Sequence, residues 1–409
     1  MSADSSSLFE PRLLPASDAD SIEGVHPTWL ARPRDLDELS ATMTEVSQRK
    51  LAVVARGRGT KLDWGLAPQR LDAVIDVSEM NRVVEHVVGD LVVRVEAGLG
   101  LAALQSSLSL VGQRLAIDEV VPDSTIGGVI ATGLTGPRRL QTGAVRDLLI
   151  GTTLVRADGR VVRAGGKVVK NVAGYDLCKL YAGSYGTLGV IAEAAFRLHP
   201  LPAAAAWVSV VVPDEKALGR AVASLLAAPL AASGIEADWP HAGSELELSI
   251  LIEGVEKSVI IRCERTAHLL GESATVSPVQ PSWWASLPGE LTVKVTTTLS
   301  AIPETLGTVA RAAETSGLTA AIRLSPGLGL VYVGLPGNSG PDQVSGFLAY
   351  VREHALASGG RAIVLRGPAS VKSSLDVWGT VRNLELMERV KAAFDPDRLL
   401  APGRFVGSI

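Results

Sequence analysis

The sequence contains very little cysteine, with Cys178 and Cys263 as the only two thiols among 409 residues. Two cysteines cannot supply the four ligands of an iron–sulfur cluster or of a cysteine-rich zinc site. A single distant pair also provides no disulfide framework. The chain is therefore not expected to hold a cluster by itself, and a reducing compartment suits it best.

Long hydrophobic runs are also missing from the sequence. No apolar run approaches the roughly 18 residues that a membrane-spanning helix needs. The first residues, MSADSSSLFEPR, lack the charged segment followed by an apolar segment that is typical of a secretion signal. We therefore expect a cytoplasmic protein, and attachment to the inner membrane through a partner would leave no trace in this chain.

No excess of one charge is present, because 39 lysines and arginines oppose 43 aspartates and glutamates, for a net charge of −4. The basic residues form no stripe, so a nucleic-acid partner is not expected. The histidines occur singly, without a metal-ligand spacing, and none can be named as a catalytic base or a metal ligand. They are His26, His86, His199, His241, His268 and His354.

Apolar residues make up 47% of the chain, and the 41 glycines and 22 prolines are dispersed between apolar runs. This composition is typical of a globular protein, and the length predicts two or three domains. Apolar spacing predicts a helix over 36–49 with Asp35 as its N-cap. Short runs rich in β-branched residues predict strands. The strands predicted in this half are 51–55, 73–77, 91–97, 148–155 and 160–163, with a second helix over 101–111.

A second region begins after Pro200-Leu201-Pro202 and repeats a strand followed by a helix. It predicts an α+β domain on an antiparallel sheet, and the repetition suggests an internal duplication. The predicted strands are 207–212, 246–252, 291–298, 320–324 and 328–334, and the predicted helices are 215–227, 254–270, 303–313 and 341–357. A last helix is predicted over 384–394.

Two glycine loops are candidates for binding a phosphate. Residues 98–103 spell G-x-G-x-x-A between a predicted strand and helix, with Asp118 and Glu119 about 20 residues further on, as in a dinucleotide-binding fingerprint. The alternative for this loop is a turn and a helix cap. Residues 56–61, RGRGTK, can form a nest of inward-facing amides for an anion, or a solvated turn. The residues alone leave these alternatives open.

A third segment, PDSTIGGVIATGLTGPRRLQTG at 122–143, is glycine-rich yet lies between apolar strands. It is too long for an ordinary connection, which suggests a backbone packed against a ligand.

Four motifs in one order give this pattern a specific meaning: RGRGT, PDSTIGG, KNVAGYD and GTLGVI, with FDPDRLLAPGR near the end. Together they resemble the FAD-binding domain shared by the vanillyl-alcohol oxidase and D-lactate dehydrogenase class of flavoproteins. GPRR at 136–139 and KNVAGYD at 170–176 are similar to the branch of FAD-binding E subunits of bacterial glycolate oxidases.

The resemblance implies an α+β fold with a two-part FAD-binding domain of the vanillyl-alcohol oxidase type, followed by an α+β cap domain with an antiparallel sheet. The expected division is an N-terminal extension over 1–26, the FAD-binding domain over 27–202, the cap over 203–380, and a C-terminal tail over 381–409 that returns to the FAD-binding domain.

The resemblance also implies which residues contact FAD. The pyrophosphate would be held by Arg56, Gly57, Arg58, Gly59, Thr60 and Lys61, and from the opposite side by Pro122, Asp123, Ser124, Thr125, Ile126, Gly127 and Gly128. Thr132, Gly133, Gly136 and Gly143 would line the ribityl and adenosine parts, and Gly186, Thr187, Gly189 and Val190 the adenine side. Asn171, Gly174, Tyr175 and Asp176 match a family motif that either contacts the flavin or fixes a loop. If residues 56–61 hold the phosphates, Gly98→Ala is expected to leave flavin retention intact.

Three departures from the resembling family bear on function. Thr60 stands where covalently flavinylated relatives have a histidine, so non-covalent FAD is expected. Tyr185 stands where the lactate dehydrogenase branch has a glutamate. The H-x-G-D-G-N-x-H stretch of the catalytic members is missing, so no catalytic residue can be named. Candidate cations for a substrate carboxylate are Arg138, Arg139, Arg366 and Arg404.

The implied function is that of the FAD-binding subunit of a glycolate oxidase (glycolate dehydrogenase) complex, which oxidises glycolate to glyoxylate. The missing histidines suggest that a homologous flavin subunit carries most of the substrate chemistry, and an iron–sulfur subunit is the implied acceptor. The alternatives are a stand-alone FAD-dependent D-2-hydroxyacid dehydrogenase and a non-catalytic flavin-fold assembly subunit. Trp283-Trp284 would belong to a subunit surface, or else to the core.

Overall fold

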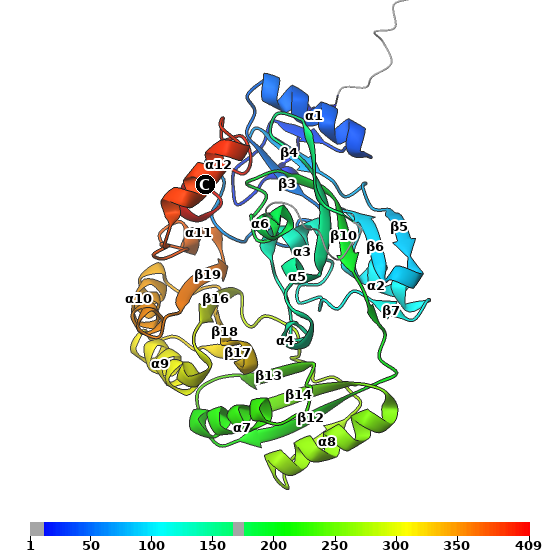
Figure 1. Ribbon diagram of the computed structural model, residues 1–409. Coiled ribbons are helices and arrows are strands. Elements are labelled where there is room, and N and C mark those ends of the chain that lie inside the picture. Colours follow the sequence, from blue (N-terminus) through cyan, green and yellow to red (C-terminus); the bar gives the residue numbers. More distant parts are fainter. Residues whose placement is uncertain (1–11, 167–175) are drawn as a thin grey trace, which may run out of the picture.

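Three principal sheets organise the chain in the computed structural model, which describes residues 12–166 and 176–409 (Figure 1). A four-stranded and a five-stranded sheet lie in the first half of the chain. An eight-stranded antiparallel sheet spans residues 204–366. This mixed α+β architecture, with an antiparallel second part, confirms the predicted fold class.

The first sheet has the order β1-β2-β4-β3, in which β2, β4 and β3 are parallel. Its helix α1 follows β2, and the Asp35 carboxylate accepts a hydrogen bond of 2.9 Å from the amide of Glu38, which confirms the predicted N-cap. Strand β3 leads directly into the glycine loop at 57–61. The elements are β1 (Leu14–Pro15), β2 (Trp29–Ala31), α1 (Leu36–Gln48), β3 (Val53–Arg56) and β4 (Ala73–Asp76).

The second sheet is antiparallel, with the order β5-β6-β10-β8-β9. Its strands are β5 (Val83–Val87), β6 (Val92–Glu96), β8 (Leu149–Val155), β9 (Val161–Gly165) and β10 (Val190–Arg197). The helices of this half are α2 (Leu101–Ser109), α3 (Ile126–Thr132), α4 (Arg139–Thr142), α5 (Val145–Leu148) and α6 (Leu177–Tyr181), and a two-stranded ribbon pairs β7 (Gln113–Arg114) with β11 (His199–Pro200). Strand β6, which precedes residues 98–103, pairs antiparallel with both of its neighbours, β5 and β10. A dinucleotide-binding fingerprint requires a parallel β-α-β unit, and residues 98–103 do not begin one. The dinucleotide-fingerprint interpretation is therefore wrong.

The glycine-rich segment 122–143 is not one long loop, because it contains α3 and α4. Helix α3 is capped by the Thr125 hydroxyl and buries Ile126, Val129 and Ile130, which have the spacing of a helical face. Five glycines within 22 residues concealed that spacing.

The cap sheet consists of two β-α-β-β-α-β units, as an internal duplication predicts. The strand order β15-β12-β14-β13-β17-β18-β16-β19 is symmetric about the pairing of β13 with β17. The first unit comprises β12 (Ala204–Val212), α7 (Glu215–Ala227), β13 (Gly234–Trp239), β14 (Leu246–Gly254), α8 (Glu256–Leu270) and β15 (Thr275–Ser277). The second comprises β16 (Leu291–Thr296), α9 (Ile302–Thr315), β17 (Ala321–Ser325), β18 (Leu330–Leu335), α10 (Pro341–Ala357) and β19 (Arg361–Arg366).

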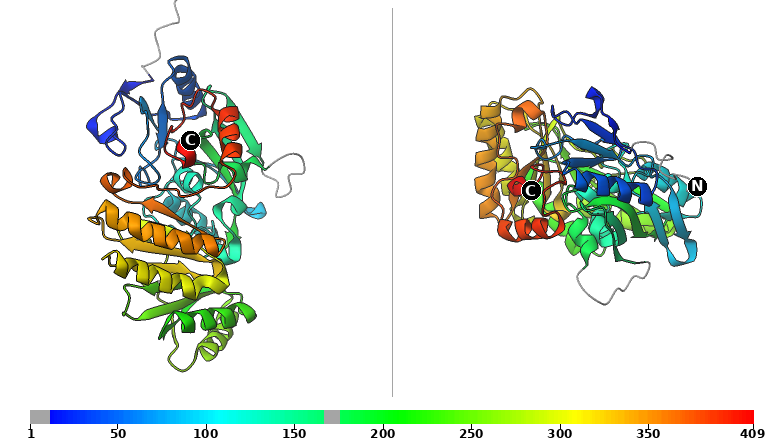
Figure 2. Two further views of the ribbon diagram at one scale, coloured as in Figure 1. Left: turned by 90° about the vertical axis from the view of Figure 1, so that its left-hand side faces the viewer. Right: turned by 90° about the horizontal axis from the view of Figure 1, so that it is seen from above.

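The four cap helices cover one face of this sheet, and the other face is turned toward the first two sheets (Figures 1 and 2). Alternate residues of a strand point to opposite faces. Val293 and Val295 accordingly lie in the core beneath the helices, whereas Lys294 between them lies on the opposite face. The inner face of the cap thus carries polar side chains.

The C-terminal segment, with α11 (Ala369–Lys372) and α12 (Leu384–Phe394), returns to the first half of the chain, where Leu400 bridges to Val53. Lys391 and Asp395 form a buried ion pair of 2.7 Å in this segment. The Lys391 ammonium group also donates to the carbonyl of Thr187 at 2.8 Å. The pair therefore joins the tail to the loop that precedes β10. None of the helices in the described ranges has the length and apolar character to cross a membrane.

We predict that Lys391→Met lowers the free energy of unfolding by about 3–5 kcal/mol, because it leaves the buried Asp395 carboxylate without its partner. Denaturant titration of the full chain measures this change. The matched control is Lys216→Met at an exposed position of α7, which should change it by less than about 0.5 kcal/mol. Equal effects of the two variants would contradict a role of the ion pair in holding the tail.

Candidate functional site

Two glycine loops, 57–61 and 122–128, meet at the end of β3. A Cβ atom placed on Gly57 would lie only 2.4 Å from the Thr125 hydroxyl oxygen, so any side chain at this position would separate the loops. The Lys61 ammonium group donates to the Ser124 hydroxyl oxygen at 2.7 Å. At the outer edge Arg58 pairs with Asp123 at 3.0 Å. The structure therefore brings together the two segments in which the sequence places the pyrophosphate.

The loop 57–61 contains backbone amides that are not hydrogen-bonded within the described part of the protein. Among the described residues, the amides of 58–61 find no hydrogen-bond acceptor. Most amides of the second loop are already used, because Ile126 and Gly127 donate to the carbonyls of Leu99 and Ala97, and Ser124 donates to the Glu119 carboxylate. Successive free amides suit an oxyanion, so residues 58–61 fit a phosphate group.

A buried positive charge lies beside these amides. Lys61 is 9% exposed, and its ammonium group contacts the hydroxyls of Ser124 and Thr60 rather than a carboxylate. Burial lowers its pKa to about 8, although the nearby Glu119 and Asp63 act in the opposite direction. Because hydroxyl groups do not neutralise the ammonium charge, Lys61 can still form an ion pair with an anionic ligand.

The tail and the N-terminal segment fix the chain just beyond this loop. The Lys372 ammonium group pairs with Glu23 at 2.7 Å and donates to the carbonyls of Asp63 and Gly65. Arg404 donates to the carbonyls of Leu62 at 2.7 Å and Trp64 at 2.9 Å. The loop is therefore preorganised by buried cations from distant parts of the sequence.

A third segment, 183–187, lies against the end of α3. Gly133 closes this helix in the left-handed conformation, and the amides of Gly183 and Tyr185 donate to the carbonyls of Ile130 and Ala131. Thr132 directs its hydroxyl to the carbonyl of Gly128 within the same helix. Gly186 has a φ of 75° with open space where a Cβ would lie.

The remaining residues expected at the site mainly contact protein. Arg56 is ion-paired with Asp20 and Asp76, Gly136 lies against Asp118, and Gly143 lies against Asp147. Thr187 is buried and bonded to the carbonyl of Ser184, Gly189 packs on Leu154, and Val190 belongs to the core. Asp176 pairs with Lys179 at the start of α6, and Asn171, Gly174 and Tyr175 fall outside the described residues.

The competing loop at 98–103 has a structural role. The amides of Gly98 and Leu99 donate to the carbonyls of Met80 and Glu96, so they are not free for a phosphate. A Cβ on Gly98 would lie 2.0 Å from the carbonyl oxygen of Val77. Gly98→Ala is therefore expected to disturb the fold, which corrects the expectation that this substitution is neutral.

The four candidate arginines differ in their partners. Arg138 is engaged with Asp118 and Glu253, and Arg366 donates to Thr292 and to the carbonyl of Gly289. Arg404 is committed to carbonyls, although its Nη1 is buried without a partner. In the described part of the chain, the Arg139 side chain has neither a hydrogen bond nor an ion pair. Of these four arginines, Arg139 is therefore the one whose guanidinium group has all of its donors available to a ligand.

Tyr185, at the position where a glutamate was expected, connects the segment 183–187 to the C-terminal part of the chain by aromatic contacts. Its ring is stacked on Phe405 at 5.2 Å and lies edge-on to Trp378 at 5.4 Å. Burial raises the pKa of Tyr185, so the phenol stays neutral. Trp284 is likewise buried, against Trp207 and Leu251, which favours the core alternative for this tryptophan pair.

The cap adds three residues that the sequence did not single out. Tyr332 packs in a cluster with Trp64 and Val121, which lie just outside the loops 57–61 and 122–128. Lys294 is its direct cross-strand neighbour, and Glu236 lies on the same face of the sheet. The sequence offered one signal for Lys294, its position between the two apolar residues Val293 and Val295. This alternation predicts that Lys294 lies on the face of the strand away from the core, but it does not predict a binding role.

The loops 57–61 and 122–128 therefore form a cradle suited to a phosphate-containing ligand. Residues 27–165 match the family model "FAD binding domain", which identifies this part of the chain as an FAD-binding domain and FAD as its cofactor.

Curated relatives include glycolate oxidase subunit GlcD of Bacillus subtilis, 33% identical over 226 residues, which covers 55% of this chain and 48% of that protein. Glycolate oxidase subunit GlcE of Escherichia coli is 33% identical over 207 residues, which covers 49% of this chain and 58% of that protein. The chain thus matches about half the length of these relatives. A solved structure of alkyldihydroxyacetonephosphate synthase has the same fold, with a TM-score of 0.69 over 92% of this chain and 76% of that chain, at 16% identity.

We predict that Gly57→Ala strongly reduces FAD retention, because the added methyl group meets Thr125, and that Gly57→Ala/Thr125→Ala restores part of it. Only the Thr125 Cβ, at 3.1 Å, would then remain close. The FAD-to-protein ratio from the visible spectrum measures retention. Gly89→Ala is the control, since nothing lies within 4 Å of its added methyl group. Full retention in Gly57→Ala would contradict the cradle.

Proposed function

We propose that this chain binds FAD non-covalently and participates in the oxidation of a small 2-hydroxy acid, with glycolate to glyoxylate as the first candidate reaction. The observation that carries the proposal is the set of free amides at 58–61 beside the buried Lys61, in contact with Ser124 and Thr125. Similarity to glycolate oxidase subunits and to a D-lactate dehydrogenase of Archaeoglobus fulgidus, 33% identical over 171 residues, supports the substrate class.

Bound FAD would supply the acceptor for the two electrons that leave the hydroxy acid. This chain would hold its pyrophosphate through the amides of 58–61 and the charge of Lys61. Gly57 permits the approach of the opposite loop, and Arg58 with Asp123 closes the outer edge. The residue at position 60 is a threonine, whose hydroxyl is too weak a nucleophile for flavin attachment, so the cofactor would remain releasable.

We further propose that the chain works in a complex with a homologous flavin subunit and an iron–sulfur subunit. Two buried, unpaired cysteines supply too few ligands for a cluster, so electrons would leave through another chain. No histidine of the described residues forms a hydrogen bond or an ion pair with residues 57–61 or 122–128. His354 bonds Thr305 in the cap, and His86 bonds Gln113 beside the second sheet. This supports the main substrate chemistry residing in the homologous subunit.

A stand-alone hydroxyacid dehydrogenase is the second candidate, and a specific observation favours it. Lys294, Tyr332 and Glu236 lie on the inner face of the cap, and Tyr332 packs against Trp64 and Val121 of the first half of the chain. A non-catalytic assembly subunit would need no polar side chains on this face. These residues could act on a substrate without help from a second chain.

We predict that the purified chain is yellow and releases all of its FAD on acid precipitation. Anaerobic glycolate should bleach the flavin once the partner subunits are added, and bleaching by the chain alone would identify the stand-alone enzyme. A colourless chain that cannot be reconstituted with FAD, alone or with its partners, would leave only the assembly-subunit alternative and contradict the proposal.

Lys61 makes FAD affinity depend on pH. Its pKa of about 8 in the free chain is depressed by burial, and an anionic pyrophosphate would raise it in the complex. The affinity should therefore be constant below about pH 8, and Kd should rise by up to about tenfold per pH unit above it. Fluorescence titration with FAD measures this slope. Lys61→Met should bind more weakly with no such slope, and an unchanged slope would assign the titration elsewhere.

A further inference from the structure

The inner face of the cap carries an ordered row of polar side chains. In the strand register, Lys294 of β16 lies opposite Tyr332 of β18, Tyr332 lies opposite Arg323 of β17, and Arg323 lies opposite Asp238 of β13. Arg323 and Asp238 form an ion pair of 2.7 Å. Lys294, at the other end of this row, has no such partner.

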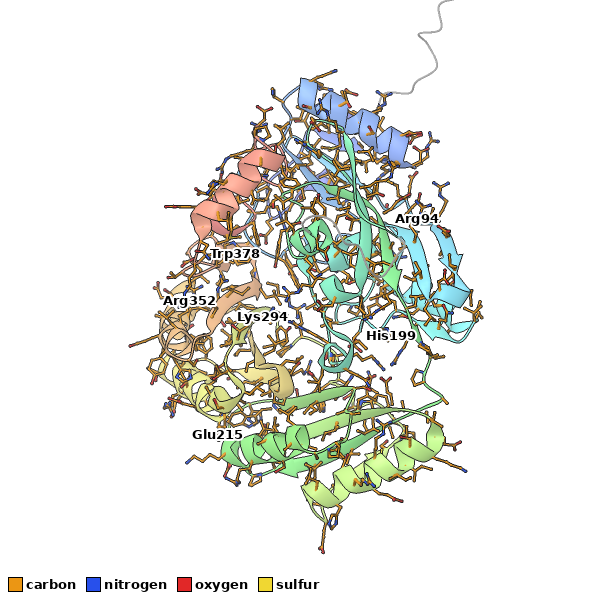
Figure 3. All side chains as sticks on the ribbon, viewed as in Figure 1. Arg94, His199, Glu215, Lys294, Arg352 and Trp378 are labelled. Carbon is orange, nitrogen blue, oxygen red and sulfur yellow. The ribbon has the colours of Figure 1, made fainter. Side chains whose placement is uncertain are left out.

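Lys294 lies where the cap faces the FAD-binding domain (Figure 3). Within the described ranges its ammonium group makes no hydrogen bond and no ion pair, and the charged groups that act on it are two cations, Arg139 and Arg361. Desolvation, with these two charges, lowers the pKa of Lys294 to about 8. A lysine in such surroundings lacks a counter-charge.

Arg139 approaches from the opposite side, on α4, which packs against β13. The contact is fixed by Ser233, whose hydroxyl donates to the Gln141 side chain at 2.8 Å. The adjacent Arg138 occupies the nearby carboxylates of Asp118 and Glu253, so these are not available to Arg139. The side chains of Arg139 on α4 and Lys294 on β16, neither of which has a hydrogen bond or an ion pair among the described residues, therefore lie close enough to interact electrostatically.

Partly buried cations are normally paired, because an unpaired charge loses hydration without compensation. A carboxylate between Lys294 and Arg139 would supply the missing charge and accept a hydrogen bond from each. The Tyr332 phenol and the Glu236 carboxyl group lie on the same face of the sheet. Burial raises the pKa of both groups, and the Oε1 atom of Glu236 has no hydrogen-bond partner among the described residues. These groups suit a hydroxyl next to the carboxylate.

We propose that Lys294 and Arg139 together bind the carboxylate of a 2-hydroxy acid, with Tyr332 and Glu236 at its hydroxyl end. The identification of this ligand as the substrate rests on the proposed function. The geometry assigns Lys294, which matches no motif of the sequence, as a residue that selects for an acid over its neutral analogues.

Competitive lysine labelling of the full chain tests the site, with and without bound FAD. Acetylation at each lysine is measured by mass spectrometry in the presence of glycolate or of glycolamide, its uncharged amide. Glycolate at about ten times its Kd should protect Lys294 about tenfold, by mass action. Glycolamide should not protect it. The exposed Lys257 should be labelled equally in every sample.

Arg139→Gln should reduce the protection of Lys294 by glycolate, whereas the control Arg146→Gln, at an exposed position of α5, should retain it. Far-ultraviolet circular dichroism verifies that both variants are folded. The absence of protection in the native chain, equal protection by glycolamide, or undiminished protection in Arg139→Gln would each overturn the proposal. Failure of the proposed function is distinguishable, because it appears as missing FAD or as a flavin that glycolate never reduces, whatever the labelling shows.

Discussion

The structure of the candidate site depends on one close approach, that of Gly57 to Thr125. Only a residue without a side chain lets the loop after β3 reach the start of α3, and this contact also carries Lys61 to Ser124. The free amides of 58–61 acquire their position from it. The first loop follows β3 of the first sheet, and the second is hydrogen-bonded to Ala97 and Leu99, just after β6 of the second sheet. The site therefore forms only when both sheets are folded.

Buried cations fall into two groups that serve different purposes. Lys372 and Lys391 have carboxylate partners as well as carbonyl acceptors, and they hold the tail to the loops. Lys61 and Lys294 have no carboxylate in contact, although burial lowers the pKa of each to about 8. The first group is satisfied by the protein itself. The second keeps its charge for a ligand, and this difference separates structural from binding lysines more clearly than exposure does.

The sequence predicted elements whose local signal was strong, such as the helix capped by Asp35 and the helices α7, α10 and α12. It missed β13 and β19, because charged residues interrupt or bound their apolar runs: Glu236 and Asp238 lie within β13, and Arg361 and Arg366 are the ends of β19. The two loops of the site were predictable only because four motifs occur in the order of a known family; spacing and residue type alone left a solvated turn open for residues 56–61. Lys294 and Glu236 were not predictable, because their role follows from strand register and from an approach of α4 that no local pattern encodes.

The duplicated cap explains why its inner face could acquire a binding site. Both units preserve the same apolar core beneath the helices, and Val208 and Val295 both belong to it. Their inner faces differ, because the first strand of one unit carries Trp207, packed against Trp284, whereas the first strand of the other carries Lys294. The core face of each unit is constrained by packing. The inner face is constrained only by the residues packed against it. In the first unit Trp207 packs against Trp284, whereas in the second unit Lys294 lies near Arg139 and keeps a positive charge that is unpaired among the described residues.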